Sequence, residues 1–239
     1  MKHCLSLGLV VSQLWAHNPD AELPIWTQYL RLGIVQAVAS EPGLATYGRF
    51  KRTTEYTFRD VRFFGHFFEE DQEVRFRQKT SRRFMTLDWL YSFNTLVYER
   101  NTLQNVDLRY HYNQGLGWLI RNSPDGNMTM ETGVAFDNSD YLNTEQKTSY
   151  LRGAVSTDQR LGRFETKFEL DYFHQMSQQA NETDLSRWQI VLEGRVKLKN
   201  RTSLIFGLTQ DNPKNESIQF DTMSLFVTLS LKQPLKWTL

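Results

Sequence analysis

The sequence predicts an all-β chain that forms one antiparallel, up-and-down transmembrane β-barrel of about twelve strands, with roughly ten to fourteen compatible with the pattern. Apolar and polar residues alternate with period two over most of the 239 residues. Connectors alternate between tight and long, and a polar mean hydropathy of −0.53 coexists with 13% aromatic residues. No apolar run reaches the roughly 18 residues that a membrane-spanning helix needs, so any membrane span must be made of strands.

The first segment, residues 1–16, resembles a secretory signal peptide. It contains one Lys and an apolar run, and cleavage is expected after Ala16. Residues 17–23 would then form a short periplasmic segment, and residues 24–239 the barrel. The alternative is that residues 1–16 are an ordinary buried segment. If they are removed, the single cysteine, Cys4, is lost with them.

Strand candidates follow one another along the whole chain. Residues 106–120 are the best case, because apolar residues from Val106 to Ile120 fill one face and polar or small ones the other. The range 73–86 is the weakest, since Gln78, Thr80 and Arg82 interrupt its apolar face. The other candidates are 24–36, 44–58, 61–69, 89–100, 128–137, 147–157, 164–172, 187–198, 202–210 and 222–231.

The connectors are evidence of a second kind. Tight turns are expected at Arg59-Asp60, Leu87-Asp88, 158–162 and 199–201, alternating with longer connectors. Outer membrane barrels have short turns on the periplasmic side, and an even strand number puts both termini there. The expected location is therefore the outer membrane of a Gram-negative bacterium, with periplasmic termini.

Three features favour lipid, rather than a protein core, as the surroundings of the apolar face. Several strands exceed the usual soluble length, both signs of charge occupy the polar face, and many rings lie near strand ends. The rings expected at the membrane interfaces are Trp26, Tyr29, Tyr56, Phe58, Trp89, Tyr91, Tyr98, Tyr110, Tyr112, Trp118, Tyr172, Trp188 and Trp237. The alternative is a soluble or periplasmic barrel whose apolar interior binds an apolar ligand.

This interpretation assigns faces to individual residues. The residues expected to face lipid or an interface are Tyr110, Tyr112, Leu116, Trp118, Phe168, Tyr172, Trp188, Leu225, Val227 and Leu229. The residues expected to face the lumen are Arg49, Lys51, Glu55, Asp107, Arg109, His111, Glu131, Glu165, Lys167, Glu169, Arg187, Glu193 and Arg195.

The segment Leu108-Arg109-Tyr110-His111-Tyr112-Asn113-Gln114-Gly115-Leu116-Gly117-Trp118 resembles the central strand of the salt-induced outer membrane protein family. Leu87 to Tyr91, Tyr98 to Arg100 and Asn122 to Phe136 resemble flanking elements of that family. The resemblance covers most of the chain from Trp26 onward and implies an outer membrane barrel of unassigned role, with a link to salt or osmotic stress. The chain departs from the usual pattern because it ends in Lys-Trp-Thr-Leu rather than in an aromatic residue.

No motif indicates catalysis. A lipid hydrolase would need a His-x-Ser pair, but Asn113 stands two residues after His111, so the nucleophile is missing. Neither a cofactor nor a metal is expected, since the histidines show no ligand spacing. The net charge of +1 gives no reason to expect nucleic acid as a partner.

The expected partners are therefore outer membrane lipids, lipopolysaccharide and, during biogenesis, the barrel-assembly machinery. Bases outnumber acids on the polar faces, which leaves two interpretations of the lumen. It is either a small pore with mild anion preference or, as we favour, a lumen closed by charge pairs.

Overall fold

The computed structural model describes residues 26–38, 41–104, 106–139, 146–177, 184–198, 201–213 and 223–235. The described chain contains twelve strands and one short 3-10 helix, η1, at Thr102–Gln104. The strands are β1 (Thr27–Ala37), β2 (Gly43–Thr53), β3 (Thr57–Phe67), β4 (Gln72–Arg83), β5 (Leu90–Asn101), β6 (Val106–Ser123), β7 (Gly126–Ser139), β8 (Gln146–Leu161), β9 (Phe164–Gln175), β10 (Arg187–Lys197), β11 (Thr202–Pro213) and β12 (Met223–Pro234).

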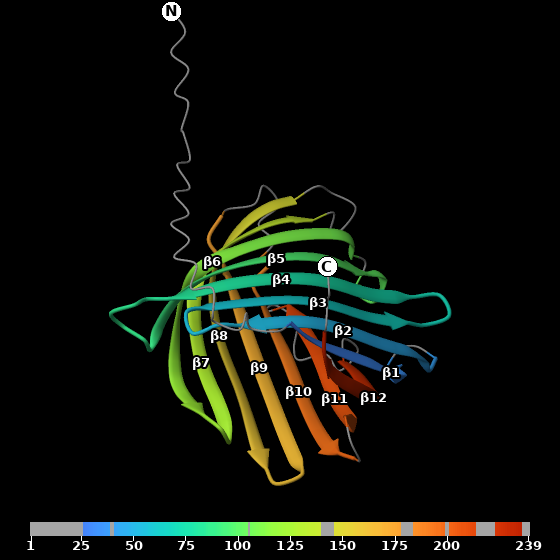
Figure 1. The fold of residues 1–239 in the computed structure, drawn as a ribbon. Helices are drawn as coiled ribbons and strands as arrows, with labels where there is room; N and C mark the ends of the chain where they lie inside the picture. Colours follow the sequence, from blue (N-terminus) through green and yellow to red (C-terminus); the bar gives the residue numbers. More distant parts are fainter. Residues whose placement is uncertain are drawn as a thin grey trace, which may run out of the picture.

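The strands pair in chain order and close into one barrel. Each strand is antiparallel to its sequence neighbour, and β1 closes the ring by pairing with β12, with Leu32 opposite Leu229. In Figure 1, β2 to β4 run across the view while β7 to β11 run steeply down it, so the sheet twists strongly around the lumen. The all-β, twelve-stranded antiparallel barrel predicted from the sequence is confirmed.

Turn positions differ from the expected ones in two places. The turn predicted at Arg59-Asp60 lies instead at residues 54–56, and Asp60 is inside β3. Thr54 stabilises this turn because its hydroxyl accepts a hydrogen bond from the Thr57 amide at 2.8 Å. The turn between β8 and β9 lies at the end of its predicted range, where Gly162 adopts a φ of +61° that favours glycine.

The wall places apolar residues outside and charges inside. Ile34 and Leu229 are 64% and 60% exposed on the outer surface, whereas Asp60 and Glu99 inside the barrel are 1% and 2% exposed. A soluble barrel would have the opposite arrangement, so that alternative is not favoured. None of the described helices is long and apolar enough to cross a membrane.

Several rings face inward, contrary to expectation. Tyr29, Phe58 and Tyr91 were expected at the membrane interfaces, but all three line the internal cavity. Tyr150 and Phe173 are also internal and only 1% exposed. Period-two alternation sorts positions between two faces, but a ring can pack against charged stems inside as well as against lipid outside.

Some predictions fall on residues that the structure does not describe. They are the signal peptide at 1–16, the periplasmic segment at 17–23, and Trp237.

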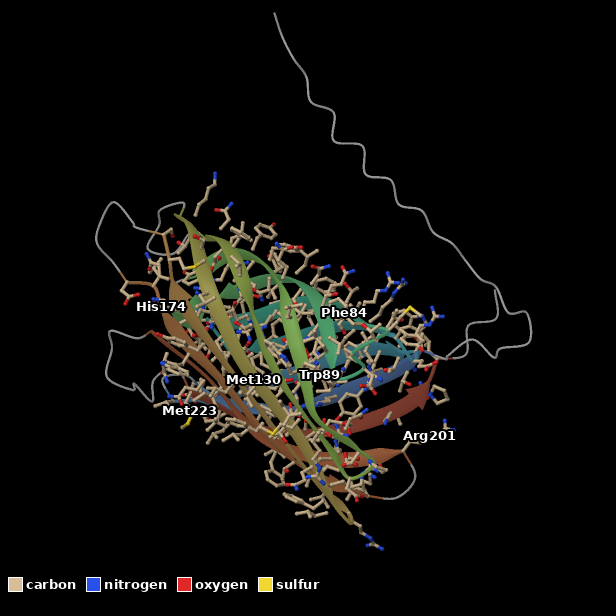
Figure 2. The ribbon with its side chains drawn as sticks, turned by 90° about the vertical axis from the view of Figure 1, so that its left-hand side faces the viewer. Phe84, Trp89, Met130, His174, Arg201 and Met223 are labelled. Atoms are coloured by element: carbon tan, nitrogen blue, oxygen red, sulfur yellow. The ribbon has the colours of Figure 1, made fainter. Side chains whose placement is uncertain are left out.

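The barrel has two distinct ends. We call the end that carries the connectors after β2, β4, β6, β8 and β10 the turn end, and the opposite end the loop end. Figure 2 shows His174 and Met223 toward the loop end on the left and Arg201 toward the turn end on the right. Thr27 and Pro234, the outer limits of β1 and β12, pair with each other at the turn end.

Candidate functional site

Seven ionisable side chains form a continuous chain of ion pairs and one histidine–carboxylate hydrogen bond across the loop end of the lumen. It runs through β3, β4, β5, β6, β7 and β10, and we call it the closing network. Its members are His66, Glu73, Arg75, Glu99, Arg109, Asp137 and Arg187.

The closing network has one strong contact and several longer ones. Arg75 donates to Glu99 at 2.7 Å, and Arg109 lies 3.5 Å from the same carboxylate. The Asp137 carboxylate lies 3.6 Å from the Arg109 guanidinium and 3.3 Å from that of Arg187. The second pair joins β7 and β10, which are three strands apart. The network therefore ties together walls that are not neighbours in the sheet.

Aromatic rings pack around both ends of the closing network. The Arg187 guanidinium lies 4.6 Å from the centroid of the Phe173 ring and 5.1 Å from that of Tyr150. His111 packs edge-on against Phe173 at 5.2 Å, and on the other side His66 lies 5.9 Å from Phe226. Through these cation–π and edge-to-face contacts, the rings occupy space between the charged side chains inside the barrel.

Further pairs cross the middle of the lumen. Arg62 on β3 reaches Glu169 on β9 at 3.4 Å, and these two strands are opposite each other in the ring of twelve. Arg31 on β1 makes a two-point contact with Glu193 on β10 at 2.8 and 2.9 Å. The Arg62–Glu169 pair therefore spans the lumen between opposite walls.

A second mid-lumen cluster centres on Glu131. Its carboxylate accepts hydrogen bonds from Lys79, from Arg152 at 3.0 Å and from the Tyr91 hydroxyl at 2.7 Å. Arg152 also donates to Asp171 at 2.7 Å. Gly117 permits this arrangement, because a Cβ there would lie 2.2 Å from the Tyr91 ring.

Between these bridges and the turn end lies a cavity of about 550 Å³. Residues 54–57 and 124–127, in and beside two turns, and residues 158–160, at the end of β8, line its mouth, so it opens at the turn end. Twelve basic and eight acidic side chains line it among the described residues. We call this cavity the cup: it opens at the turn end, ion pairs cross the lumen beyond it, and its described lining has an excess of positive charge.

Arg77 is an arginine of the cup without a hydrogen-bond or ion-pair partner in the described chain. Arg77 lines the cavity directly opposite Arg62 on the neighbouring strand. Within the described chain its side chain makes no hydrogen bond or ion pair, and its Nε is buried without a partner. The nearby acids Glu169 and Asp171 are bonded to other cations. Arg77 therefore presents a free positive charge inside the cup.

A larger apolar hollow of about 830 Å³ lies on the outer surface across β8 to β12 and β1. Phe168, Leu192 and Phe206 line it, and all three belong to the outward-facing set of their strands. It faces the surroundings of the barrel and is separate from the charged cup.

The structure places most of the predicted lumen residues inside the barrel. Arg109, His111, Glu131 and Arg187 are buried. Arg49, Lys51, Glu165, Lys167, Glu169, Glu193 and Arg195 line the cup.

Two of the predicted lumen residues are different. Glu55 is not on a strand: it is exposed in the β2–β3 turn, at the mouth of the cup, because that turn lies earlier than predicted. The side chain of Asp107 is outside the described part of the structure.

The residues predicted to face lipid lie on the outward positions of their strands. Tyr110 and Leu229 are 51% and 60% exposed. Tyr172 stacks on Trp188 at 4.1 Å, with Trp188 38% exposed. The others at outward positions are Tyr112, Leu116, Trp118, Phe168, Leu225 and Val227.

The sequence prediction missed several central lumen residues. Asp60 was assigned to a turn, and Arg31 was hidden among the apolar residues of 24–36. Arg62, Glu73 and Glu99 lie on strands whose inner faces also carry rings or small residues. What the sequence offered was a single charged residue within each strand. Such a residue predicts an oppositely charged partner inside the barrel but does not say which residue that partner is.

The described residues contain no group of three His, Cys, Asp or Glu side chains that could hold a metal ion. His111 lies in the lumen, where its Nε2 is 2.8 Å from the Asn113 side-chain nitrogen. The charged side chains that line the lumen can attract ions of opposite charge and repel ions of like charge.

Three comparisons relate the chain to known proteins. The model of a family described as a protein of unknown function, DUF481, matches residues 68–158. No curated protein matches the chain.

Among solved structures, the NanC porin shares 8% identity with a TM-score of 0.55, covering 85% of this chain and 98% of that one. The KdgM porin shares 8% identity with a TM-score of 0.48, covering 85% and 98%. At 8% identity the likeness to the NanC porin is one of fold: the chain shares the barrel architecture of that outer membrane porin.

Proposed function

We propose that this chain is an outer membrane barrel closed to free diffusion, whose cup binds small anionic solutes at the turn end. The observation that carries the proposal is the one-sided lumen. Ion pairs bridge the middle and the loop end, while a positively charged cavity of about 550 Å³ opens at the other end.

The membrane location is supported by the outer surface. In hydrocarbon, only helices and closed barrels satisfy every backbone hydrogen bond, and this sheet closes without an edge. Exposed Leu, Ile, Val and Phe side chains surround the barrel. We place the turn end in the periplasm, as in other barrels with short periplasmic turns. Lipopolysaccharide and the barrel-assembly machinery are the proposed partners in that membrane.

Membrane insertion is tested by fractionation and gel migration. The protein should be found in the membrane fraction, and it should migrate faster unheated than boiled, because a folded barrel resists the detergent of the gel. Recovery in the soluble fraction without detergent would refute the outer membrane location.

The closed lumen is tested by single-channel recording in planar bilayers. A permeating ion would have to break the Arg62–Glu169 bridge and then pass the closing network, where the pairs are buried. We expect no conductance above the lipid background. Stable conductance steps would instead favour the pore interpretation, with anion preference set by the excess of basic residues.

The anion specificity is supported by Arg77. An arginine that is not neutralised by the protein can donate to a carboxylate, phosphate or sulfate through paired N–H groups. The cavity has room for a molecule of the size of a small sugar acid or tricarboxylate. Binding there would place the negative charge among Arg77, Arg62 and Lys79.

Isothermal titration with sulfate and with citrate tests this anion site in the detergent-solubilised protein. Arg77→Gln should weaken binding about tenfold or more, the loss expected for one charge-assisted hydrogen bond. Arg121→Gln, which removes an exposed charge of β6 outside the cup, is the matched control and should leave binding unchanged. Equal binding by both variants, or none by the unaltered protein, would overturn the anion site.

The physiological setting that we propose, salt or osmotic stress, rests on the family resemblance described above. It predicts that a strain lacking the protein grows poorly at raised NaCl and recovers when the unaltered gene is returned. Growth at the same rate as the parent strain across NaCl concentrations would contradict this setting.

A further inference from the structure

Three arginines lie together on the outer surface of β2, β3 and β4, near the turn end. Arg52 and Arg59 are directly opposite each other on paired strands. Arg82 pairs with Thr57, two residues before Arg59, and so is the diagonal neighbour of Arg59. Arg59, on the middle strand, is therefore within about 8 Å of each of the other two arginines. We call Arg52, Arg59 and Arg82 the outer arginine cluster.

The protein does not neutralise the outer arginine cluster. Within the described chain, none of the three forms an ion pair, and the Nε of Arg52 is buried without a hydrogen-bond partner. Like charges directly opposite each other on paired strands destabilise a sheet. The acids of these strands cannot relieve this repulsion, since Asp60, for example, points to the lumen and binds Arg49 and Arg62 there. The outer arginine cluster therefore carries an uncompensated positive charge on the outer surface of the barrel.

The surroundings of the cluster indicate its depth in the membrane. One row toward the middle of the barrel, Phe50 pairs with Val61, and Phe50 is 37% exposed. On the other side, toward the turns, Trp89 is 47% exposed. An apolar band on one side and an amphipathic ring on the other mark the level of lipid headgroups.

The cluster is confined to one side of the barrel. At the same end, β8, β9 and β12 present Leu161, Phe164 and Leu231 outward, with Leu161 65% exposed. Single exposed arginines also occur elsewhere at this end, at Arg121 and Arg201. Three arginines on adjacent strands, without an intervening acid, favour one localised ligand.

We propose that the outer arginine cluster binds the phosphate of an anionic phospholipid, whose acyl chains lie along the apolar outer wall of β2 to β4. This inference rests on the membrane location proposed above, but it is independent of the lumen. The arginines supply the charge-assisted hydrogen bonds that a phosphodiester accepts, and Phe50, Phe63 and Phe76, each 37–41% exposed, supply the apolar contact.

Native mass spectrometry of the detergent-solubilised protein tests the site. Phosphatidylglycerol and phosphatidylcholine are added at equal concentration, and the lipid that stays bound is counted. The unaltered protein should retain phosphatidylglycerol preferentially. The double variant Arg52→Gln, Arg59→Gln should lose that preference by at least about fivefold, given the attraction of each basic residue to anionic lipid.

Two controls make the result specific. The double variant Arg121→Gln, Arg201→Gln removes two exposed arginines that lie outside the cluster and should keep the preference. A parallel sample with excess inorganic phosphate should retain its lipid, because free phosphate lacks the apolar contacts. Displacement of the lipid by inorganic phosphate would show a simple anion site and overturn the lipid assignment.

The outcomes separate this inference from the proposed function. Heat-dependent gel migration first establishes that each variant is folded. If the protein is absent from membranes, the proposed function itself fails. If it is inserted but the cluster variant and the control variant bind lipid equally, only the phospholipid site is refuted.

Discussion

The two ends of the lumen contain the same kinds of residues in very different surroundings. At the loop end, the side chains of Arg109, Asp137 and Arg187 are 8%, 2% and 6% exposed. At the turn end, those of Arg160 and Lys197 are 49% and 43% exposed, although both pair with Glu165 at 3.0 Å. The buried contacts of Asp137, at 3.6 and 3.3 Å, are longer than these exposed pairs, so burial rather than distance is what distinguishes the two groups.

The difference teaches that an ion pair closes a lumen only where its surroundings exclude water. Around the closing network, Tyr150, Phe173 and Phe226 provide low-polarity walls. A buried charge that loses its partner costs several kcal/mol, whereas an exposed pair contributes about 1 kcal/mol or less. Three substitutions test this comparison, from the largest expected effect to the smallest.

The largest effect is expected from Asp137→Ala. The substitution removes the acceptor shared by Arg109 and Arg187 and leaves two buried guanidinium groups beside each other. We expect the free energy of unfolding to fall by about 3–5 kcal/mol. The measurement is urea unfolding of the detergent-solubilised barrel, followed by tryptophan fluorescence.

Asp158→Ala is the matched control for this change. Asp158 is an exposed acid at the turn end, where it accepts one hydrogen bond from Asn127 at 3.3 Å. The Asp158→Ala substitution should lower the free energy of unfolding by less than about 1 kcal/mol. Similar losses in the two variants would mean that the loop end is as accessible to water as the turn end.

An intermediate effect is expected from Glu131→Gln in the middle of the lumen. The amide keeps the size of the side chain and can still accept a hydrogen bond from Tyr91, but it no longer neutralises Lys79 and Arg152. We expect a loss of about 1–3 kcal/mol in the same unfolding experiment. Glu55→Gln, in the exposed β2–β3 turn, provides the control and should have no measurable effect.

The smallest effect is expected from Arg160→Gln. This side chain is half exposed, and its partner Glu165 keeps Arg195 at 2.9 Å and Lys197 at 3.0 Å. The free energy of unfolding should change by less than about 1 kcal/mol, and less still at high salt. A loss as large as that of Asp137→Ala would contradict the division of the lumen into a closed and an open end.

Part of the lumen was predictable from the alternation along each strand. Arg109 and His111 alternate with Tyr110 and Tyr112, and the structure has the first pair buried inside and Tyr110 exposed outside. Asp60 was not predictable, because no glycine or proline marks the preceding turn and the acid looked like a turn residue. Its place in β3 becomes evident through Arg49, which donates to it at 2.6 Å from the paired strand.

By itself, the sequence determined the twelve strands, their antiparallel order and the side of the wall on which most charges lie, because period-two alternation is a local property of an extended chain. The tertiary structure decided which charges meet. Arg62 and Glu169 are 107 residues apart and contact each other only because closure and twist bring β3 opposite β9. The same closure placed Tyr150 and Phe173 against Arg187 of the closing network and left the cup open at the turn end, since the packing of side chains across a lumen depends on the whole ring of strands.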